Sequence, residues 1–294
     1  MDKPYFIVNP VSGSGLAAQK FKEVSKLLEA KGVDFSFDYT AAPRHATALA
    51  KAAIERGKRL IAAVGGDGTV NEVAAAIIGT DAVLAVLPFG TGNDFARGIG
   101  LPEDDEGLVN VLTGGKSRLI DAGMAGDGFF INVAGFGFDV DVVRYTEKYK
   151  RRLNGMLPYM LGILQSLIYL SRTEAEIVTD SGETFNVTVT LLSACNGTRF
   201  AGGINLAPLA DYSDGLMDIC ILKKISRLRF LYLLPKYMKG KHLKYKNEFL
   251  YFKAKSVKVK TLTHSLMECD GEIKGETPAE FRVLSGAIDF MIGE

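Results

Sequence analysis

Short apolar runs alternate with amphipathic segments through the first 120 residues of the chain. The runs have the length of buried strands, and the segments between them have the spacing of helices. This alternation predicts a doubly wound α/β fold, with a mostly parallel sheet covered by helices on both faces. The predicted strands are Tyr5–Val8, Val33–Tyr39, Leu60–Val64, Val83–Leu87 and Leu119–Ile120, and the predicted helices lie near 16–30, 45–56, 70–78 and 105–113.

The pattern changes after Asp121, where short strands follow one another and several alternate polar with apolar residues. We expect an α/β domain over 1–120, a mainly antiparallel β-sandwich domain with helices over 121–286, and a segment at 287–294 that packs back on the first domain. The strands predicted after Asp121 are Glu176–Thr179 and Phe185–Leu192, joined as a hairpin, then Met217–Leu222, Ser256–Leu262, Leu266–Cys269, Phe281–Leu284 and Ala287–Ile292, with helices near 158–171 and 226–239.

The loop after the third predicted strand carries the strongest chemical signal. Residues 65–68 read GGDG, and a helical pattern begins at Thr69. Glycines let a ligand approach the backbone, and the helix start offers unpaired N–H groups to an anion. A carboxylate beside phosphates is repulsive unless Mg²⁺ lies between them or the acid accepts a proton from a nucleophile. The alternative is a structural turn in which Thr69 and Glu72 form a capping box.

Three other predicted strand ends carry similar residues. Residues 9–13 read NPVSG, residues 39–40 read YT, and residues 90–94 read GTGND. Because ligands gather at the carboxyl ends of parallel strands, these loops are expected to converge on a phosphate-bearing ligand.

A dinucleotide-binding fingerprint is the competing interpretation of the first loop. Residues 13–18 fit GxGxxA, and Asp34 and Asp38 lie where a ribose-binding acid is expected. This interpretation leaves the loops at 65–71 and 91–94 without a role. No lysine follows the glycine loops, so the P-loop pattern GxxxxGK[ST] is absent.

Composition narrows the chemistry. The 294 residues are 47% hydrophobic and 23% charged, which is ordinary globular usage. The three cysteines are far apart and the three histidines have no metal-ligand spacing, so neither a disulfide framework nor a zinc site is indicated. Acid–base chemistry is therefore expected to rest on carboxylates. The N-terminus enters a strand directly and lacks the apolar core of a signal peptide, which favours a cytoplasmic location.

Charge is distributed unevenly although the net charge is only +1. Residues 223–260 hold eleven Lys and two Arg against Glu248 alone, a local charge of +12, interleaved with leucines and aromatic residues. A solvated charged face is one interpretation. A surface for anionic lipid head groups is another, because each basic residue near a membrane contributes about 1 kcal/mol. Nucleic acid is disfavoured, since no recognised binding motif accompanies the charge.

Leu153–Ser171 contains no charged residue and resembles a membrane span at first sight. Pro158 favours a helix start, and the fourteen residues from there to Ser171 would extend about 21 Å. The hydrocarbon core of a bilayer is about 30 Å thick, so a buried or membrane-surface helix is expected.

The motifs together resemble the catalytic domain of diacylglycerol kinases. This group also holds sphingosine and ceramide kinases and bacterial lipid kinases, and is more distantly related to NAD kinases. The resemblance rests on GGDGTVNEV at 65–73, with the NPxSG strand end before it and GTGNDFAR at 90–97 after it. It continues through residues 135–139, 196–197, 201–203, 207–208, 214–218 and 270–272, in order and over essentially the whole chain.

The resemblance implies a two-domain lipid kinase in which nucleotide and lipid meet between the domains. Asp67 and Asp94 would organise Mg²⁺ and the transferring phosphoryl group, and Glu272 would take the proton from the lipid hydroxyl. A structural Mg²⁺ would be bound by Asp211, Asp214 and the backbone carbonyl of Leu216, and the oxygen at position 211 could equally come from the main chain. The residues that would contact ATP are Asn9, Pro10, Ser12, Gly13, Thr40, Gly65, Gly66, Asp67, Gly68, Thr69, Asn71, Thr91 and Asn93.

We therefore expect an ATP- and Mg²⁺-dependent lipid kinase, with diacylglycerol as the favoured acceptor and phosphatidate as its product. Sphingoid bases, monoacylglycerol and phosphatidylglycerol stay open as acceptors. A non-catalytic lipid or nucleotide binder is disfavoured because both the Asp67 loop and Glu272 are present. Asp67 remains the alternative base. The enzyme is expected to contact anionic membranes transiently from the cytoplasm, and a homodimer is left open.

Overall fold

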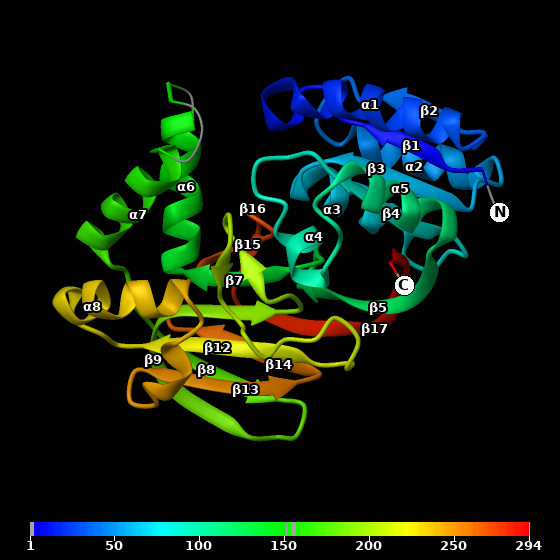
Figure 1. Cartoon of the computed structure of the whole chain (residues 1–294). Coiled ribbons are helices and arrows are strands. Elements are labelled where there is room, and N and C mark those ends of the chain that lie inside the picture. The colour runs from blue at the N-terminus through cyan, green and yellow to red at the C-terminus, as the bar shows by residue number, and fades with distance from the viewer. Residues whose placement is uncertain (1–2, 151, 154–156, 294) are drawn as a thin grey trace. The chain divides into compact units, whose positions relative to one another are not determined.

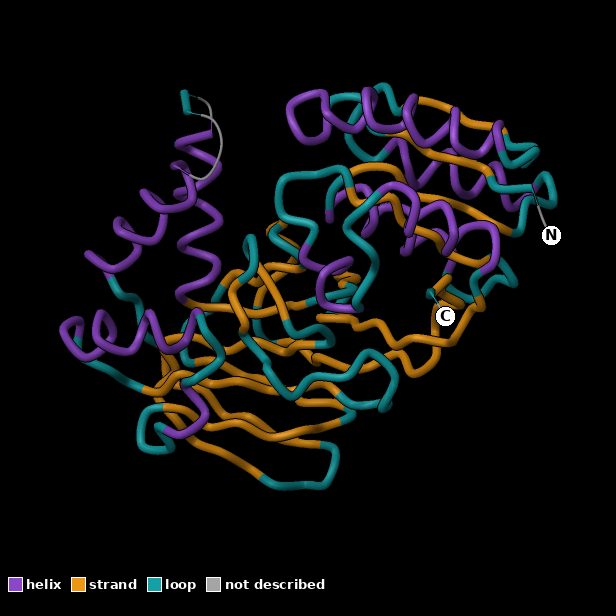
Figure 2. Tube along the Cα trace, viewed as in Figure 1, coloured by secondary structure: helices purple, strands orange, loops and turns teal. Residues whose placement is uncertain are grey.

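The computed structural model describes residues 3–150, 152–153 and 157–293 (Figure 1). They form two compact units. The first runs to Asp121 and includes the chain from Gly286 onward, and the second is Ala122–Ser285. Helices alternate with strands in the first unit, whereas strands dominate the second (Figure 2).

A parallel sheet forms the centre of the first unit. Its strands β1 (Tyr5–Val8), β2 (Ser36–Tyr39), β3 (Leu60–Gly65) and β4 (Val83–Pro88) lie in the order β4-β3-β1-β2. The register pairs Val8 with Val64, and Val64 with Leu87, so the carboxyl ends of β1, β3 and β4 lie level. Every residue of β1 and β3 is buried, as expected for parallel strands covered on both faces.

Five helices accompany this sheet, together with a short 3₁₀ turn at Ser12–Gly15. The helix α1 buries Ala17, Phe21, Val24 and Leu28, which share one face at helical spacing. Phe95 of α4 packs edge-on against Phe290 of the C-terminal strand, with ring centroids 5.2 Å apart. The helices are α1 (Leu16–Ala30), α2 (His45–Glu55), α3 (Asp67–Ile77), α4 (Asp94–Ile99) and α5 (Asp105–Gly114).

The second unit is built on antiparallel strands in the order β16-β15-β7-β9-β8-β14-β17, and β12 pairs with β9 and β13. Two strands, β5 and β17, begin in one unit and end in the other. The strands are β5 (Lys116–Ala125), β6 (Gly128–Phe130), β7 (Val133–Gly137), β8 (Thr173–Thr179), β9 (Thr184–Cys195), β10 (Arg199–Phe200), β11 (Ile204–Asn205), β12 (Met217–Lys223), β13 (Phe249–Ala254), β14 (Ser256–Thr261), β15 (Leu266–Cys269), β16 (Glu272–Glu276) and β17 (Ala279–Ile292).

Alternate residues of β9 enter two different cores. Leu192 and Ala194 belong to a hydrophobic core whose other members also come from the strands of this unit. Leu191 and Cys195 belong to a second core, which contains Phe230 of α8. This period of two places the helices on one face of the sheet. The helices of this unit are α6 (Phe138–Lys150), α7 (Leu157–Tyr169) and α8 (Arg227–Met238), with a 3₁₀ turn at His242–Lys244 (Figure 1).

The structure confirms the predicted fold class, with a mostly parallel first part and an antiparallel second part. The hairpin of β8 and β9 and the helix α8 lie where the pattern predicts them. The predicted strands Phe281–Leu284 and Ala287–Ile292 are one continuous strand, β17. The helices α4 and α6 were not predicted. The apolar helix α7 spans Leu157–Tyr169 instead of 158–171.

The alternative interpretation of the GGDG loop, a turn in which Thr69 and Glu72 form a capping box, disagrees with the structure. The helix begins at Asp67, and Gly66 is its N-cap residue. The carboxylate of Glu72 instead accepts the N–H groups of Arg44 and Ala46 at 2.9 and 3.0 Å, and so caps α2. Of the apolar segment Leu153–Ser171, residues 154–156 lie outside the described part of the chain. Among the helices that are described, none is long and apolar enough to cross a membrane.

Candidate active site

Three loops at the carboxyl ends of β1, β3 and β4 meet closely in the first unit. A Cβ atom added to Gly90 would lie 2.2 Å from the Cα of Gly66. One added to Gly13 would lie 2.7 Å from the carbonyl oxygen of Phe89. Both distances are shorter than van der Waals contact, so these positions require glycine. The glycines of the motif therefore bring three backbone segments into contact.

Asn9 joins the first loop to the second. Its Nδ2 donates to the Thr69 hydroxyl at 3.0 Å, and its Oδ1 accepts the Val11 N–H at 3.3 Å. Thr69 is buried on the first turn of α3. The two side chains predicted to contact ATP thus hold each other in place before any ligand is considered.

Asp67 joins the second loop to the third. It is the first residue of α3, and its Oδ1 accepts the N–H of Phe95 in α4 at 3.0 Å. This bond leaves Oδ2 for a cation, and carboxylate oxygen is the donor that Mg²⁺ prefers. Asp94 is the first residue of α4, with only 4% of its surface exposed. The structure brings these two acids to neighbouring helix starts.

Asn93 closes the third loop. Its Oδ1 accepts the N–H of Gly90 at 2.9 Å, and its Nδ2 donates to the carbonyl of Gly90 at 3.1 Å. Thr40 lies at the end of the outer strand β2, where its N–H donates to the carbonyl of Val8 at 2.9 Å. Asn71 is buried on α3. The remaining predicted nucleotide contacts lie in these three loops or at the strand end and helix start that border them, and are Pro10, Ser12, Gly65, Gly68 and Thr91.

The turn between β15 and β16 contains the predicted base. Asp270 has a φ of +47°, and its carboxylate accepts the N–H groups of Ile131, Asn132 and Val133 at 2.7, 3.0 and 2.9 Å. Glu272 follows as the first residue of β16. Its side chain is 60% exposed and lies 3.3 Å from the ammonium group of Lys274. The backbone before Glu272 is fixed, whereas its carboxylate is accessible.

The predicted structural metal site lies in the loop before β12. Asp211 accepts the N–H and the hydroxyl of Ser213, both at 2.9 Å. Asp214 accepts the N–H of Leu216 at 3.0 Å, and its other oxygen lies 2.5 Å from the Lys253 ammonium. Oxygen donors of this type suit Mg²⁺, but Lys253 competes for the same oxygen. Within the described part of the chain, no group of three acidic, His or Cys side chains could hold a metal ion.

Two acids of the second unit, Asp139 in the first turn of α6 and Glu268 in β15, were assigned no role from the sequence. Asp139 is partly buried, and desolvation raises the pKa of its carboxyl to about 7, although a hydrogen bond from Ser193 at 3.0 Å opposes the shift. Burial also raises the pKa of Glu268 well above its usual value. A buried acid inside a short apolar run is the one signal that could have identified Glu268.

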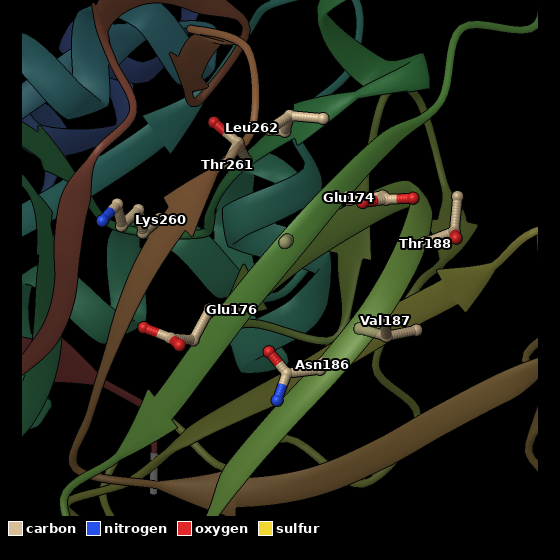
Figure 3. A pocket seen from close by; sticks show the side chains of 9 residues that line it. Glu174, Glu176, Asn186, Val187, Thr188, Lys260, Thr261 and Leu262 are labelled. Atoms are coloured by element: carbon tan, nitrogen blue, oxygen red, sulfur yellow. The ribbon is translucent and has the colours of Figure 1, made fainter.

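A groove of about 420 Å³ lies on the outer face of β8, β9 and β14 (Figure 3). Its charged side chains come from neighbouring strands, with Glu176 paired in register to Lys260. None of the predicted catalytic, nucleotide or metal residues lines it. The lining residues are Glu174, Ala175, Glu176, Asn186, Val187, Thr188, Lys260, Thr261 and Leu262.

Comparison with known proteins identifies the family. Residues 3–125 match the family model of the diacylglycerol kinase catalytic domain, and residues 132–292 match the YegS C-terminal NAD kinase beta sandwich-like domain. Over 284 residues the chain is 33% identical to diacylglycerol kinase of Bacillus subtilis (strain 168), covering 96% of this chain and 93% of that protein. The chain belongs to the diacylglycerol kinase family. As a member it is a lipid kinase.

Solved structures agree on the fold of this diacylglycerol kinase family member. A diacylglycerol kinase from Bacillus anthracis str. Sterne has a TM-score of 0.77 at 23% identity, over 99% of this chain and 97% of that one. An NAD kinase from Archaeoglobus fulgidus has a TM-score of 0.53 at 13% identity, over 99% and 94% of the two chains. The resemblance stated from the motifs is therefore confirmed. The dinucleotide fingerprint at 13–18 shares only Gly13 with the NPVSG strand end, and the whole of it lies within residues 3–125, which match the diacylglycerol kinase catalytic domain.

Proposed function

We propose that this lipid kinase transfers the γ-phosphoryl group of ATP to the hydroxyl of diacylglycerol, with Mg²⁺ as cofactor and phosphatidate as product. One observation carries the proposal. Three glycine-rich loops meet around Asp67 and Asp94 in a chain whose full-length relatives are named diacylglycerol kinase. Phosphoryl transfer needs positioning and charge neutralisation more than covalent catalysis; the loops would supply the first, and Mg²⁺ held by the two acids would supply the second.

The first unit is proposed as the nucleotide-binding domain. With no P-loop lysine, the phosphates would be bound by backbone N–H groups of the glycine loops and by small hydroxyls such as Ser12 and Thr91. Asp67 and Asp94 would hold Mg²⁺, which supplies charge neutralisation at the phosphates. The contact of Asp67 with Phe95 fixes the distance between the loops that carry these two acids.

The second unit is proposed as the lipid-binding domain, and Glu272 as the general base. Its carboxylate is exposed, so it is free to accept a proton from the acceptor hydroxyl. The structural Mg²⁺ would be held by Asp211, Asp214 and the carbonyl of Leu216. The Lys253 ammonium would first have to move away from the Asp214 carboxylate oxygen that it now contacts. That ion would order the loop that leads into β12.

Access to an insoluble acceptor requires a membrane-facing surface. The helix α7 exposes Leu157, Met160, Leu164 and Ile168, which recur at helical spacing along one stripe. The helix α8 exposes Leu228, which is 82% accessible, within the basic stretch 223–260. We propose that these apolar side chains and the surrounding lysines contact anionic lipid transiently.

The test is an acceptor panel assayed with γ-labelled ATP and thin-layer separation of the lipid products. Diacylglycerol, monoacylglycerol, a sphingoid base and phosphatidylglycerol would each be presented in the same detergent micelle. The proposal expects labelled phosphatidate and the highest kcat/KM for diacylglycerol. A higher kcat/KM for another lipid would reassign the acceptor, and no labelled lipid from any member would overturn the proposed reaction.

A further inference from the structure

None of the surface of Glu268 is exposed, although its strand is the neighbour of β16, which stands at the end of the strand order. Glu268 belongs to β15, opposite Gly135 of β7 and Ile273 of β16. A Cβ atom added to Gly135 would lie 2.3 Å from the carbonyl oxygen of Leu192, so the strand next to Glu268 requires glycine at this position. The Oε2 atom of Glu268 accepts the N–H of Gly271 at 2.7 Å. A side chain from the strand thus holds the turn that follows it.

The turn is held at two consecutive residues immediately before Glu272. Asp270 is held by three backbone N–H groups, and Gly271 is held by Glu268. Both residues have left-handed φ values, +47° and +85°, and for Asp270 this conformation is unfavourable without compensating contacts. These contacts select one direction for the chain as it enters β16, and so one starting position for the Glu272 side chain.

The surroundings of Glu268 oppose a charge on it. Desolvation by burial raises the pKa of its carboxyl most, and the charges of Asp139 in α6 and of Asp270 raise it further, whereas the hydrogen bond from the Gly271 N–H opposes the shift. The other oxygen, Oε1, is buried and has no hydrogen-bond partner among the described residues. Burial therefore favours the neutral form of the carboxyl that accepts the Gly271 N–H, and an apolar side chain would pack at this position at lower cost. The presence of an acid at this buried position is explained by the hydrogen bond that it accepts from the Gly271 N–H.

We propose that Glu268 is a positioning residue that holds the Asp270–Gly271–Glu272 turn and thereby directs Glu272 at the acceptor hydroxyl. The inference rests on the base role proposed for Glu272. It predicts that the contact between Oε2 and the Gly271 N–H matters for turnover, whereas a charge on Glu268 does not. Small displacements of a reacting group have large kinetic effects, about 10²-fold for 1 Å.

The test compares two variants of Glu268 with a matched control. Glu268→Leu removes the acceptor for Gly271 and is expected to lower kcat by about 10–100-fold with the KM for ATP unchanged. Glu268→Gln keeps a neutral acceptor of the same shape and is expected to retain kcat within about threefold. The control is Met267→Ala, which weakens the opposite face of β15 without touching Gly271. All three are assayed well below their melting temperatures.

A double variant separates positioning from general destabilisation. If Glu268 acts through Glu272, Glu268→Leu should cause no further loss of kcat in a Glu272→Gln background. Wild-type kcat in Glu268→Leu, equal loss in Glu268→Gln, or equal loss in the Met267 control would overturn the inference. If the base assignment itself is wrong, the Glu272→Gln variant alone would have a normal kcat. That result differs from each of the outcomes above, so the two failures can be told apart.

Discussion

The two candidate regions of the molecule are held in place in different ways. In the first unit, hydrogen bonds from Asn9 to Thr69 and from the Phe95 N–H to Asp67 connect the three loops. The backbones of Gly66 and Gly90 are also in close contact. In the second unit, the backbone before Glu272 is fixed while its carboxylate is 60% exposed. The proposed phosphate site is thus preorganised, which is where charge stabilisation is most effective. The side chain of the proposed base is instead left exposed.

The largest effect is expected at the preorganised region. Asp67→Ala should lower kcat by at least about 10³-fold, on the scale of lost transition-state electrostatics. The melting temperature should change little, because Asp67 makes one hydrogen bond to a short helix. Steady-state kinetics and thermal unfolding measure the two quantities. The control is Asp81→Ala, which removes an exposed acid paired with Arg59 in the same unit. Near-normal kcat in Asp67→Ala would remove the proposed role.

The exposed region is tested by Glu272→Gln. A general base contributes about 10²–10⁴-fold, so kcat should fall in that range while ATP affinity is retained. Kinetics and equilibrium ATP binding measure the two effects separately. Collapse of ATP binding with residual turnover would make Glu272 a nucleotide or metal ligand and Asp67 the better candidate base. Lys274→Gln is the control, since it frees Glu272 of its ion pair without removing the carboxylate.

The proposed structural metal is expected to have an intermediate effect. Mg²⁺ at 100 times its Kd should raise the melting temperature by about 5 °C or more, and chelator should reverse the rise. Asp214→Ala should lose this response together with part of the activity. Lys253→Met, which removes only the competing ammonium, should keep it. A wild-type melting temperature that is indifferent to both Mg²⁺ and chelator would show that residues 211–216 form only a turn.

The smallest catalytic effect is expected for the basic stretch. Lys239, Lys241 and Lys244 are exposed, and changing all three to Gln should weaken binding to anionic vesicles. Binding of the wild type should also fall with salt, because exposed charges are screened within about 10 Å at 0.1 M. Activity on detergent-dispersed lipid should survive. The matched control changes Lys22, Lys26 and Lys51 of the first unit to Gln. Equal flotation of both variants and the wild type at low salt would contradict the docking role.

Local sequence patterns predicted most of the fold because the apolar residues that recur at strand or helix spacing are the ones that are buried. The strands β1 and β15 have the predicted bounds, Tyr5–Val8 and Leu266–Cys269. The alternative of a capping box between Thr69 and Glu72 is wrong because of a contact between residues far apart in the sequence. Glu72 is 28 residues from Arg44, and its carboxylate binds the start of α2 instead of its own helix. The six-residue helix α4 is too short to show a period, and the contact of Phe95 with Asp67 helps define its start.

The candidate site likewise has local features that the sequence predicts and non-local contacts that it does not. The glycine loops and the acids Asp67 and Asp94 could be chosen from the motifs, because their spacing along the chain is fixed. The Glu268 contact could not, since its side chain lies in a strand that reads as apolar and its partner is in the following turn. Lys253 was also missed, because its pairing with Asp214 depends on the register of β12 with β13.

The central claim is that Asp67 meets the phosphates through a metal ion, and the Mg²⁺ dependence of phosphoryl transfer tests it most directly. The rate of labelled phosphatidate formation would be measured against Mg²⁺ concentration for the wild type, Asp67→Asn and the control Asp81→Asn. The account predicts that Asp67→Asn alone raises the Mg²⁺ concentration needed for half-maximal rate and lowers the maximal rate. The same Mg²⁺ curve for Asp67→Asn as for the wild type would contradict it.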